Sequence, residues 1–320
     1  MTAAIRIGTC SFADEALTKH WYPRGVRTGE ARLRHYAERF DTVEIDSTFY
    51  ALPTAERTAL WAERTPAGFL FHVKAFAMMT RHPVRPEQLP PELRVGVALG
   101  RGGRIDRPSR ELRAEVFAQF HAALAPLREA GKLGGILMQL PPYVVPKSVS
   151  YGYLEWAQEQ LRGDRMLTEF RHMSWLDDEH RDEVLRFLED RGQTLVVTDS
   201  PRVDARNVVP TVIATTTNIA YVRMHGRNAA TWNIRGRSAA ERFDYLYSDN
   251  ELEEWTWPLR ELADSTREVF VFFNNNGRSS VNSDDEEPTW IAQAPTNAVM
   301  LRRLLKQAGL PVTDPGADLS

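Results

Sequence analysis

The sequence predicts a TIM-like (β/α)8 barrel, in which parallel strands lie inside an outer ring of helices. Eight short apolar segments alternate with seven or eight helical patterns along the 320 residues, an order typical of α/β folds. The turn after the first segment lacks the glycine fingerprint of an open dinucleotide-binding sheet. Each of the eight segments ends in polar or ionisable residues, and active sites form at the carboxyl ends of barrel strands.

The strand segments are short runs rich in β-branched, aromatic and aliphatic residues. In the second one, Val43 and Ile45 alternate with Glu44 and Asp46. Because side chains alternate between the faces of a strand, both carboxylates lie on one face. We expect the eight strands at residues 5–10, 43–46, 69–74, 134–140, 165–170, 194–198, 219–225 and 269–273.

The helices between these strands carry apolar stripes and recognisable ends. Leu33, Tyr36 and Phe40 share one face of a helix expected over 30–40. Residues that favour helix starts or ends mark the others. They are Thr54, Ser109, Ser150 and the Ser248–Glu251 capping box at starts, and Gly131 and Gly192 at ends.

The chain is long enough for a large core, and we expect residues 1–320 to form a single domain. Three excursions from the barrel are expected, at about 77–108, 200–218 and 275–295. The first contains five prolines and four glycines, which predict a long loop above the barrel rather than a helix. In the third, the acidic run Ser283–Glu287 favours a solvated loop over a cation site.

Composition and charge narrow the class of protein. A formal net charge of −3 gives no global basic field of the kind that nonspecific nucleic-acid binders show. The single cysteine, Cys10, cannot form an intramolecular disulfide, and the N-terminus lacks the layout of a secretory signal. No apolar run approaches the roughly 18 residues of a membrane helix. We therefore expect a soluble, cytoplasmic protein without a membrane partner, and the oligomeric state stays open.

The polar residues that follow the strands predict a site at the barrel mouth. By alternation, Ile45, Phe170, Val222 and Met224 face the helices, and their polar neighbours face inward. A network of ion pairs that only aligns the strands is the structural alternative. The predicted site residues are Glu44, Asp46, Lys74, Gln139, Glu169, Arg171, Asp199, Arg223, His225 and Asn274.

Seven sequence blocks, in order, resemble the signature of the domain-of-unknown-function 72 family, the YecE-like proteins. The resemblance spans residues 5 to about 305. The blocks are Gly8–Ser11, Thr42–Tyr50, Phe71–Ala75, Gln139–Pro142, Glu169–Trp175, Tyr221–Arg227 and Phe272–Asn275.

This resemblance implies a TIM-like barrel and a shared polar pocket, without an assigned reaction. The pocket residues it implies are Glu44, Lys74, Gln139, Glu169, Arg171, Arg223, His225 and Asn274. The chain departs from the family pattern in that Cys10 and Phe12 replace a serine and a tryptophan. The excursion at 77–108 and the acidic insert at 279–289 are further departures.

The first functional hypothesis is an enzyme that uses acid–base chemistry on a small phosphate- or carboxylate-bearing substrate. Glu169 or Glu44 is the expected general base and His225 an acid or base. Lys74 and Arg223 form the expected anion clamp. A less favoured catalytic role for Lys74 is that of a Schiff-base nucleophile. Gln139 and Asn274 orient the substrate, and Arg171, Asp46 and Asp199 complete the binding set. A divalent metal on Glu44, Glu169, Asp199 and His225 is less favoured, because the cations at the mouth would repel it.

Two other classes of function compete with this hypothesis. A nucleic-acid phosphodiesterase, like the barrel-fold repair nucleases, would use a basic stretch and exposed aromatic residues for stacking. The arginines are Arg101, Arg104, Arg107, Arg110 and Arg113, and the aromatic residues are Trp21, Tyr22, Tyr50, Tyr143, Trp175 and Trp232. A non-catalytic anion-binding or adaptor protein would capture a ligand without turnover.

Overall fold

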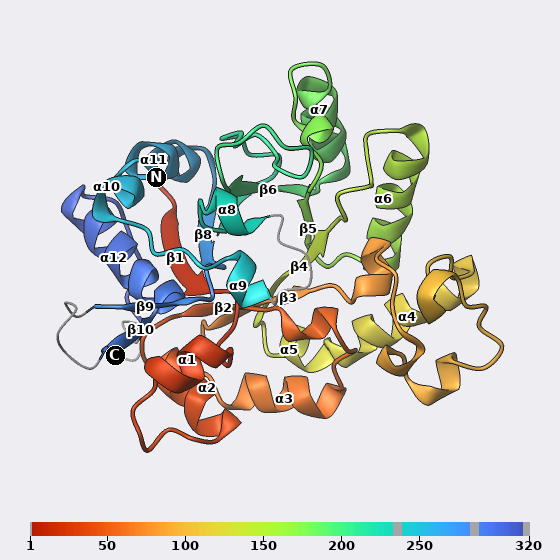
Figure 1. The fold of residues 1–320 in the computed structure, drawn as a ribbon, viewed down its shortest axis with the longest axis horizontal. Coiled ribbons are helices and arrows are strands. Elements are labelled where there is room, and N and C mark those ends of the chain that lie inside the picture. Colours follow the sequence, from red (N-terminus) through yellow and green to blue (C-terminus); the bar gives the residue numbers. More distant parts are fainter. Residues whose placement is uncertain (1, 233–238, 282–287, 316–320) are drawn as a thin grey trace.

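The computed structural model describes residues 2–232, 239–281 and 288–315, and it confirms the predicted fold class. Eight parallel strands form a nearly closed barrel surrounded by helices (Figure 1). The strands are β1 (Ala4–Thr9), β2 (Thr42–Ile45), β3 (Leu70–Lys74), β4 (Leu133–Gln139), β5 (Met166–Glu169), β6 (Thr194–Asp199), β7 (Ile219–Met224) and β8 (Glu268–Phe273).

The barrel has a seam between β1 and β2, which are the two ends of the described sheet order. The Tyr36 hydroxyl spans this seam, accepting from the Thr9 N–H at 2.9 Å and donating to the Thr42 carbonyl at 3.2 Å. The two backbones also approach closely, since a Cβ at Gly8 would lie 2.4 Å from the Thr42 carbonyl oxygen. The Tyr36 hydroxyl and the close approach at Gly8 therefore close the barrel between β1 and β2, where the series of backbone-paired strands ends.

The helices begin and end close to the residues that predicted them. Thr54 and Ser109 cap α3 and α4, the Ser248 box caps α10, and Gly192 ends α7 in a left-handed conformation. The helices are α1 (Glu15–His20), α2 (Gly29–Ala37), α3 (Ala55–Glu63), α4 (Arg110–Ala123), α5 (Ala125–Glu129), α6 (Ser148–Gln160), α7 (Arg181–Arg191), α8 (Ala229–Trp232), α9 (Ala239–Arg242), α10 (Asp249–Glu253), α11 (Thr256–Ser265) and α12 (Gln293–Gln307). No helix in the described ranges is long and apolar enough to cross a membrane.

Several helix predictions differ from the structure, and the helix expected from Ser248 through Leu262 is divided into α10 and α11. The helix expected from Ser109 to Gly131 is divided at Leu124, because Pro126 in the first turn of α5 has no N–H to continue it. The helix expected to open at Ser150 begins at Ser148. The short helix α1, capped by Asp14, lies between the first expected strand and the helix expected over 30–40, where the sequence analysis gives no helix. Its six residues are too few to show a helical period.

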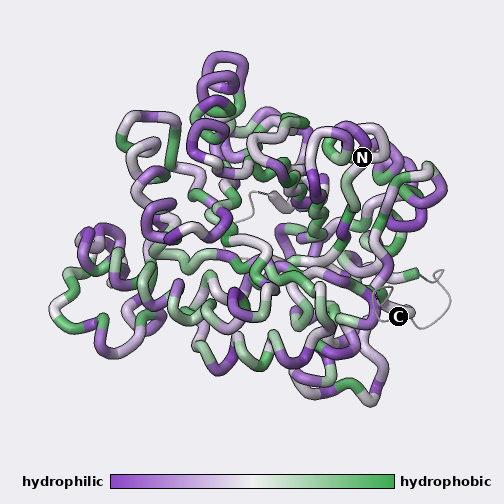
Figure 2. Tube along the Cα trace, turned by 180° about the vertical axis from the view of Figure 1, so that it is seen from behind, coloured by the Kyte–Doolittle hydropathy of each residue, from purple (hydrophilic) through white to green (hydrophobic). Residues whose placement is uncertain are grey.

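The lower part of the barrel interior is apolar. The His72 ring lies 4.4 Å from the ring of Phe270 and 5.1 Å from those of Tyr221 and Phe272. Aliphatic side chains of β4, β5, β6 and β7 complete this layer. From behind, hydrophobic segments run through the central strands and the projecting end that carries α7 is hydrophilic (Figure 2).

The three expected excursions have different structures. Residues 77–108 contain 3-10 turns and a bridge between Val84 and Ile105, and residues 200–218 contain no helix or strand. The third excursion carries an antiparallel hairpin of β9 (Arg278–Ser280) and β10 (Trp290–Ala292). The acidic run at 283–287 lies outside the described residues, and a single domain over 1–320 stays a prediction.

Candidate functional site

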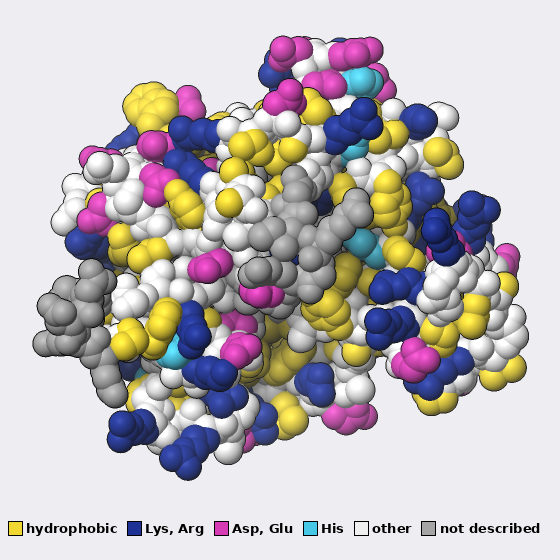
Figure 3. All heavy atoms as spheres, in the orientation of Figure 1, with side chains coloured by type: hydrophobic (Ala, Val, Ile, Leu, Met, Phe, Trp, Pro, Cys, Tyr) yellow, Lys and Arg dark blue, Asp and Glu magenta, His cyan; other side chains and the backbone are white. Residues whose placement is uncertain are grey.

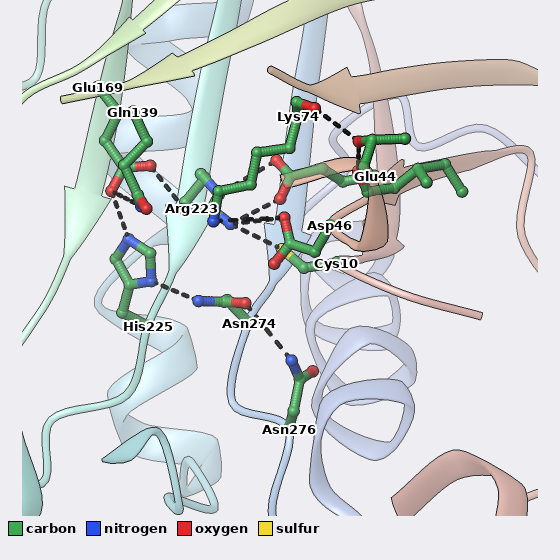
Figure 4. Close-up of polar contacts among 12 residues, drawn as sticks. Cys10, Glu44, Asp46, Lys74, Gln139, Glu169, Arg223, His225, Asn274 and Asn276 are labelled. Carbon is green, nitrogen blue, oxygen red and sulfur yellow. Dashed lines mark hydrogen bonds and ion pairs between the residues drawn. The ribbon is translucent and has the colours of Figure 1, made fainter. Parts of the chain in front are cut away.

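Arg223 lies between two glutamates at the upper end of the barrel interior (Figure 4). Its Nη2 is 2.6 Å from Glu44 Oε1, and its Nη1 is 2.6 Å from Glu169 Oε2. All three side chains are 0% exposed. Together with His225, which is also buried, they form what we call the buried ion layer.

The alternation of side chains along the strands places this layer inside the barrel. Glu44 comes from β2, Glu169 from β5, and Arg223 from β7 with His225 directly after its end. The residues expected to face the helices do so and pack in the outer core. They are Ile45, Phe170, Val222 and Met224.

Both oxygens of Glu169 are engaged by partners. Oε1 accepts from Gln139 Nε2 at 2.7 Å and from Arg171 Nη1 at 3.2 Å. Oε2 accepts from Arg223 at 2.6 Å. Burial opposes ionisation, but Arg223, His225 and Arg171 outweigh it and lower the pKa of Glu169 well below its usual range. Glu169 is therefore a buried anion whose acceptor positions are filled by the protein.

His225 connects Glu169 to Asn274. Its Nε2 is 3.1 Å from Glu169 Oε1, and its Nδ1 is 2.9 Å from Asn274 Nδ2. Burial lowers the pKa of His225 to about 4, so the ring is neutral near pH 7. The amide of Asn274 can only donate through Nδ2, so Nδ1 accepts and Nε2 carries the proton that it donates to Glu169.

Glu44 differs from Glu169 in its protonation. Its Oε2 accepts from the Tyr221 hydroxyl at 2.6 Å and from Arg223 Nε at 3.1 Å. Burial raises the pKa of Glu44 to about 7, with a smaller contribution from Asp46, and Arg223 opposes this rise. One guanidinium thus holds one carboxylate that is ionised and another that exchanges a proton near neutral pH.

A cavity of about 530 Å³, the mouth cavity, opens at the carboxyl ends of the strands. Residues outside the strands, such as Tyr50, Trp232 and Phe243, form its outer walls. The buried ion layer lies beneath it, and none of its four residues is among the described residues of the lining. The strand ends contribute Asp46, Lys74, Gln139, Arg171 and Asn274 to the lining.

The mouth cavity is cationic. Its lining contains Lys74, Arg104, Arg171 and Arg242 but a single described carboxylate, that of Asp46. Lys74 Nζ is 3.7 Å from Asp46 Oδ1 and 4.9 Å from the centre of the Phe49 ring. The Arg171 guanidinium lies 4.8 Å from the Trp232 ring. Aromatic rings therefore support two of the cations and leave part of their hydrogen-bonding capacity open.

Nine of the ten predicted site residues lie in the buried ion layer or line the mouth cavity. Asp199 does not, because it shares the outward face of β6 with Leu195 and Val197. Its carboxylate accepts from Arg227 Nε at 3.0 and 3.1 Å instead. The prediction assumed that any polar residue after an apolar run faces inward, and alternation shows why this one does not.

The sequence interpretation missed several residues of the site. Tyr221 precedes Arg223 by two positions, so alternation would have placed it inside. His82 lies in the 77–108 excursion and Arg242 at the end of the short helix α9, and neither carries a periodic signal. Burial, together with nearby Lys74 and Arg171, lowers the pKa of His82 to about 3 and keeps that ring neutral.

The residues considered for a metal are not arranged around a common point. Arg223 lies between Glu44 and Glu169, and Asp199 is paired with Arg227. Within the described ranges, no group of three His, Cys, Asp or Glu side chains is placed to hold a metal ion.

The residues considered for nucleic-acid binding divide into buried and exposed sets. Trp175 is buried and stacks on Phe170 at 4.3 Å. Tyr50 and Tyr143 are 58% and 60% exposed. Figure 3 shows Lys and Arg side chains gathered over the 77–108 excursion and α4, on the right of the view.

Comparison with known proteins identifies one matching family and a related bacterial protein. Residues 6–317 match the family described as "Protein of unknown function DUF72". The UPF0759 protein YunF of Bacillus subtilis (strain 168) is 34% identical over 251 residues, which cover 77% of this chain and 81% of that protein.

Solved structures of DUF72 family proteins have the same fold. One from Enterococcus faecalis V583 is 26% identical, with a TM-score of 0.73, and the match covers 94% of this chain and 95% of that one. Another from Thermotoga maritima MSB8 is 28% identical, with a TM-score of 0.71, over 95% of this chain and 99% of that one.

Proposed function

The chain belongs to the DUF72 family of proteins of unknown function, and we propose that it is an enzyme performing acid–base chemistry on a small anionic substrate. The observation that carries this proposal is the charge of the mouth cavity, whose described lining has four cations and one carboxylate. Guanidinium and ammonium groups match the oxygens of phosphate and carboxylate. A molecule that bears one of these groups is the expected ligand class.

Lys74 and Arg171 are the expected anion-binding pair. Their side chains are 12% and 17% exposed, so they are fixed in place but open to the cavity. The ion pair of Lys74 with Asp46 is 3.7 Å long, which is longer than a hydrogen bond. The ammonium donors of Lys74 can therefore turn to a ligand without breaking a short bond.

Asp46 is the expected group that exchanges a proton with the substrate. It is 23% exposed and lies beside Glu44, whose pKa burial raises to about 7. The raised pKa of Glu44 makes one proton available beside Asp46 near neutral pH. Lys74 would stabilise the negative charge that develops on the substrate.

Glu169 and His225 have positioning roles in this proposal. Glu169 accepts from Gln139 and Arg171, and His225 accepts from Asn274. These three partners line the mouth cavity, so the buried ion layer fixes the orientation of the groups that meet the substrate. This assignment replaces the sequence-based hypothesis that Glu169 and His225 transfer protons themselves.

The test is to incubate the protein with phosphorylated and carboxylated metabolites in D2O and to follow product and deuterium incorporation by NMR. We expect Asp46→Asn to keep ligand binding and to lose turnover by about 100-fold or more. Lys74→Met should weaken binding by about tenfold or more. Lys19→Met, which removes a lysine from an exposed pair with Glu15, is the matched control.

Two outcomes would contradict the proposal. Binding without turnover across the whole panel would favour the non-catalytic anion-binding or adaptor role. Full turnover by Asp46→Asn would remove Asp46 from the chemistry.

Phosphodiester cleavage on nucleic acid is a second candidate, favoured by one observation. A hollow of about 570 Å³ is lined by Arg81, Arg107 and Arg113 together with the exposed Tyr143. Guanidinium groups beside an exposed ring suit a single strand. Affinity for a single-stranded oligonucleotide that falls steeply with salt would support this candidate, and a flat salt dependence would count against it.

A further inference from the structure

The mouth cavity continues into a second, more apolar space, which we call the excursion groove. This groove has a volume of about 810 Å³ and runs beneath the 77–108 excursion. Phe49, Tyr50 and Ala51 line it from the segment after β2, and Ala77 and Pro83 line it from the excursion. Arg85, Glu87 and Gln88 also line it, but most of the surface that it exposes is apolar, and it lies directly beside a cationic cavity.

Four residues line both the mouth cavity and the excursion groove, so the two spaces adjoin. Phe49 lies at the middle of this junction, and Lys74 Nζ is 4.9 Å from the centre of its ring. The rings of His82 and Tyr50 meet it edge-on at 5.0 and 5.3 Å. Arg104, the fourth shared residue, adds a second cation at the junction.

The excursion groove is held open by contacts within the protein. Gln88 Nε2 donates to the Tyr50 carbonyl at 3.0 Å, and Gln88 Oε1 accepts from the Arg85 N–H at 2.8 Å. Val84 and Ile105, which are buried, pair across the base of the excursion. The groove is thus a preformed feature that fixes the distance between the excursion and Tyr50.

Tyr50 packs edge-on against Phe49, but 58% of it is exposed to solvent beside the groove. Apolar surface that continues from a charged pocket suits a ligand with both kinds of surface. A phosphate or carboxylate alone would occupy the mouth cavity and leave the groove empty.

We propose that the ligand is an amphipathic anion, with its charged group at Lys74 and an apolar tail along Phe49 and Tyr50. This inference rests on the proposed function and specifies its substrate class. The tail leaves water as it enters the groove, so affinity rises with tail length until the groove is filled. A fully buried methylene raises affinity by about fourfold.

The experiment is isothermal titration with inorganic phosphate and with methyl, butyl and hexyl phosphate, each below the concentration at which it aggregates. We expect affinity to rise along the series by about two- to fourfold per methylene. Tyr50→Ser should flatten this dependence, taken relative to the same variant's affinity for inorganic phosphate. Tyr143→Ser, which changes an equally exposed tyrosine outside the groove, should leave both unchanged.

The outcomes separate the inference from the proposed function. Equal affinities across the series would overturn the amphipathic ligand while leaving the anion site in place. A length dependence that persists in Tyr50→Ser would place the tail elsewhere and overturn the groove assignment. If neither phosphate nor any alkyl phosphate binds, and Lys74→Met changes nothing, the anion site itself fails and the inference with it.

Discussion

The buried ion layer and the mouth cavity contain the same kinds of side chain but satisfy them differently. In the layer, Arg223 contacts Glu44 and Glu169 at 2.6 Å each, and all three are 0% exposed. In the cavity, Lys74 is 12% exposed and contacts Asp46 at 3.7 Å. Charges at this barrel mouth therefore divide into those that pair closely within the protein and those that stay open to the cavity.

The difference has an energetic basis. Ions removed from water lose several kcal/mol of solvation each, and short hydrogen bonds in the correct geometry must offset that loss. Removing one partner of such a set leaves the other buried and uncompensated. Cations at the cavity keep water or a ligand within reach, so their removal affects binding more than folding.

The largest expected effect is that of Arg223→Met. The change leaves Glu44 and Glu169 without the guanidinium that joins them, and we expect a loss of about 3–5 kcal/mol in the free energy of unfolding. Chemical denaturation measures it. Lys74→Met is the matched control in the mouth cavity, with an expected change below about 1 kcal/mol. Similar stabilities of the two variants would remove the distinction between the regions.

The second prediction concerns the pH dependence of His225. Burial lowers the pKa of His225 to about 4 in the folded protein, whereas an unfolded histidine has a pKa of about 6.5. Below about pH 6.5 the unfolded chain binds the proton first. The folded state then loses about 1.4 kcal/mol per pH unit until about pH 4.

Wild type must be compared with variants, because Glu44 also titrates in this range. Its raised pKa of about 7 makes stability fall as pH rises, which is opposite to the effect of His225. The advantage of wild type over His225→Asn in unfolding free energy should shrink between about pH 6.5 and pH 4.5. His180→Asn is the control, since Asp177 raises the pKa of His180, which is partly exposed. An advantage that stays constant over this range would show that His225 does not titrate as described.

The smallest expected effect is that of Tyr221→Phe. It removes the 2.6 Å hydrogen bond to Glu44, which should cost about 1–3 kcal/mol because the acceptor stays buried. The loss should be larger at pH 8 than at pH 6, since the bond favours the ionised carboxyl group. Tyr143→Phe, at an exposed tyrosine, should change stability by less than about 0.5 kcal/mol. Equal losses at both pH values would argue against a proton on Glu44 near neutrality.

Most strands and helices could be predicted from local sequence patterns, and so could the alternation that places Arg223 inside the barrel. The caps at Thr54 and Ser109 and the alternation around Arg223 depend on neighbouring residues alone, and each agrees with the structure. Glu44 and Asp46 show the limit of such patterns. They share a face in the sequence pattern, but β2 ends at Ile45, so Glu44 enters the buried layer and Asp46 reaches the cavity.

The residues that the sequence could not place came from outside the strands. His82 lies in the 77–108 excursion and Arg242 at the end of α9, and they meet Lys74 and Arg171 only where the chain folds over the barrel mouth. The division of a predicted helix at Leu124 and the short helix α1 are also local details that a periodic pattern does not resolve.

The sequence by itself determined the barrel, the inward direction of its polar side chains and the family to which the chain belongs. The tertiary structure decided how deep each of those side chains lies, and hence which charges hold the strands together and which can meet a ligand. Side-chain direction repeats every two residues along a strand and is a local property. Depth depends on how eight strands close and which distant loops cover them, and no local period contains that information.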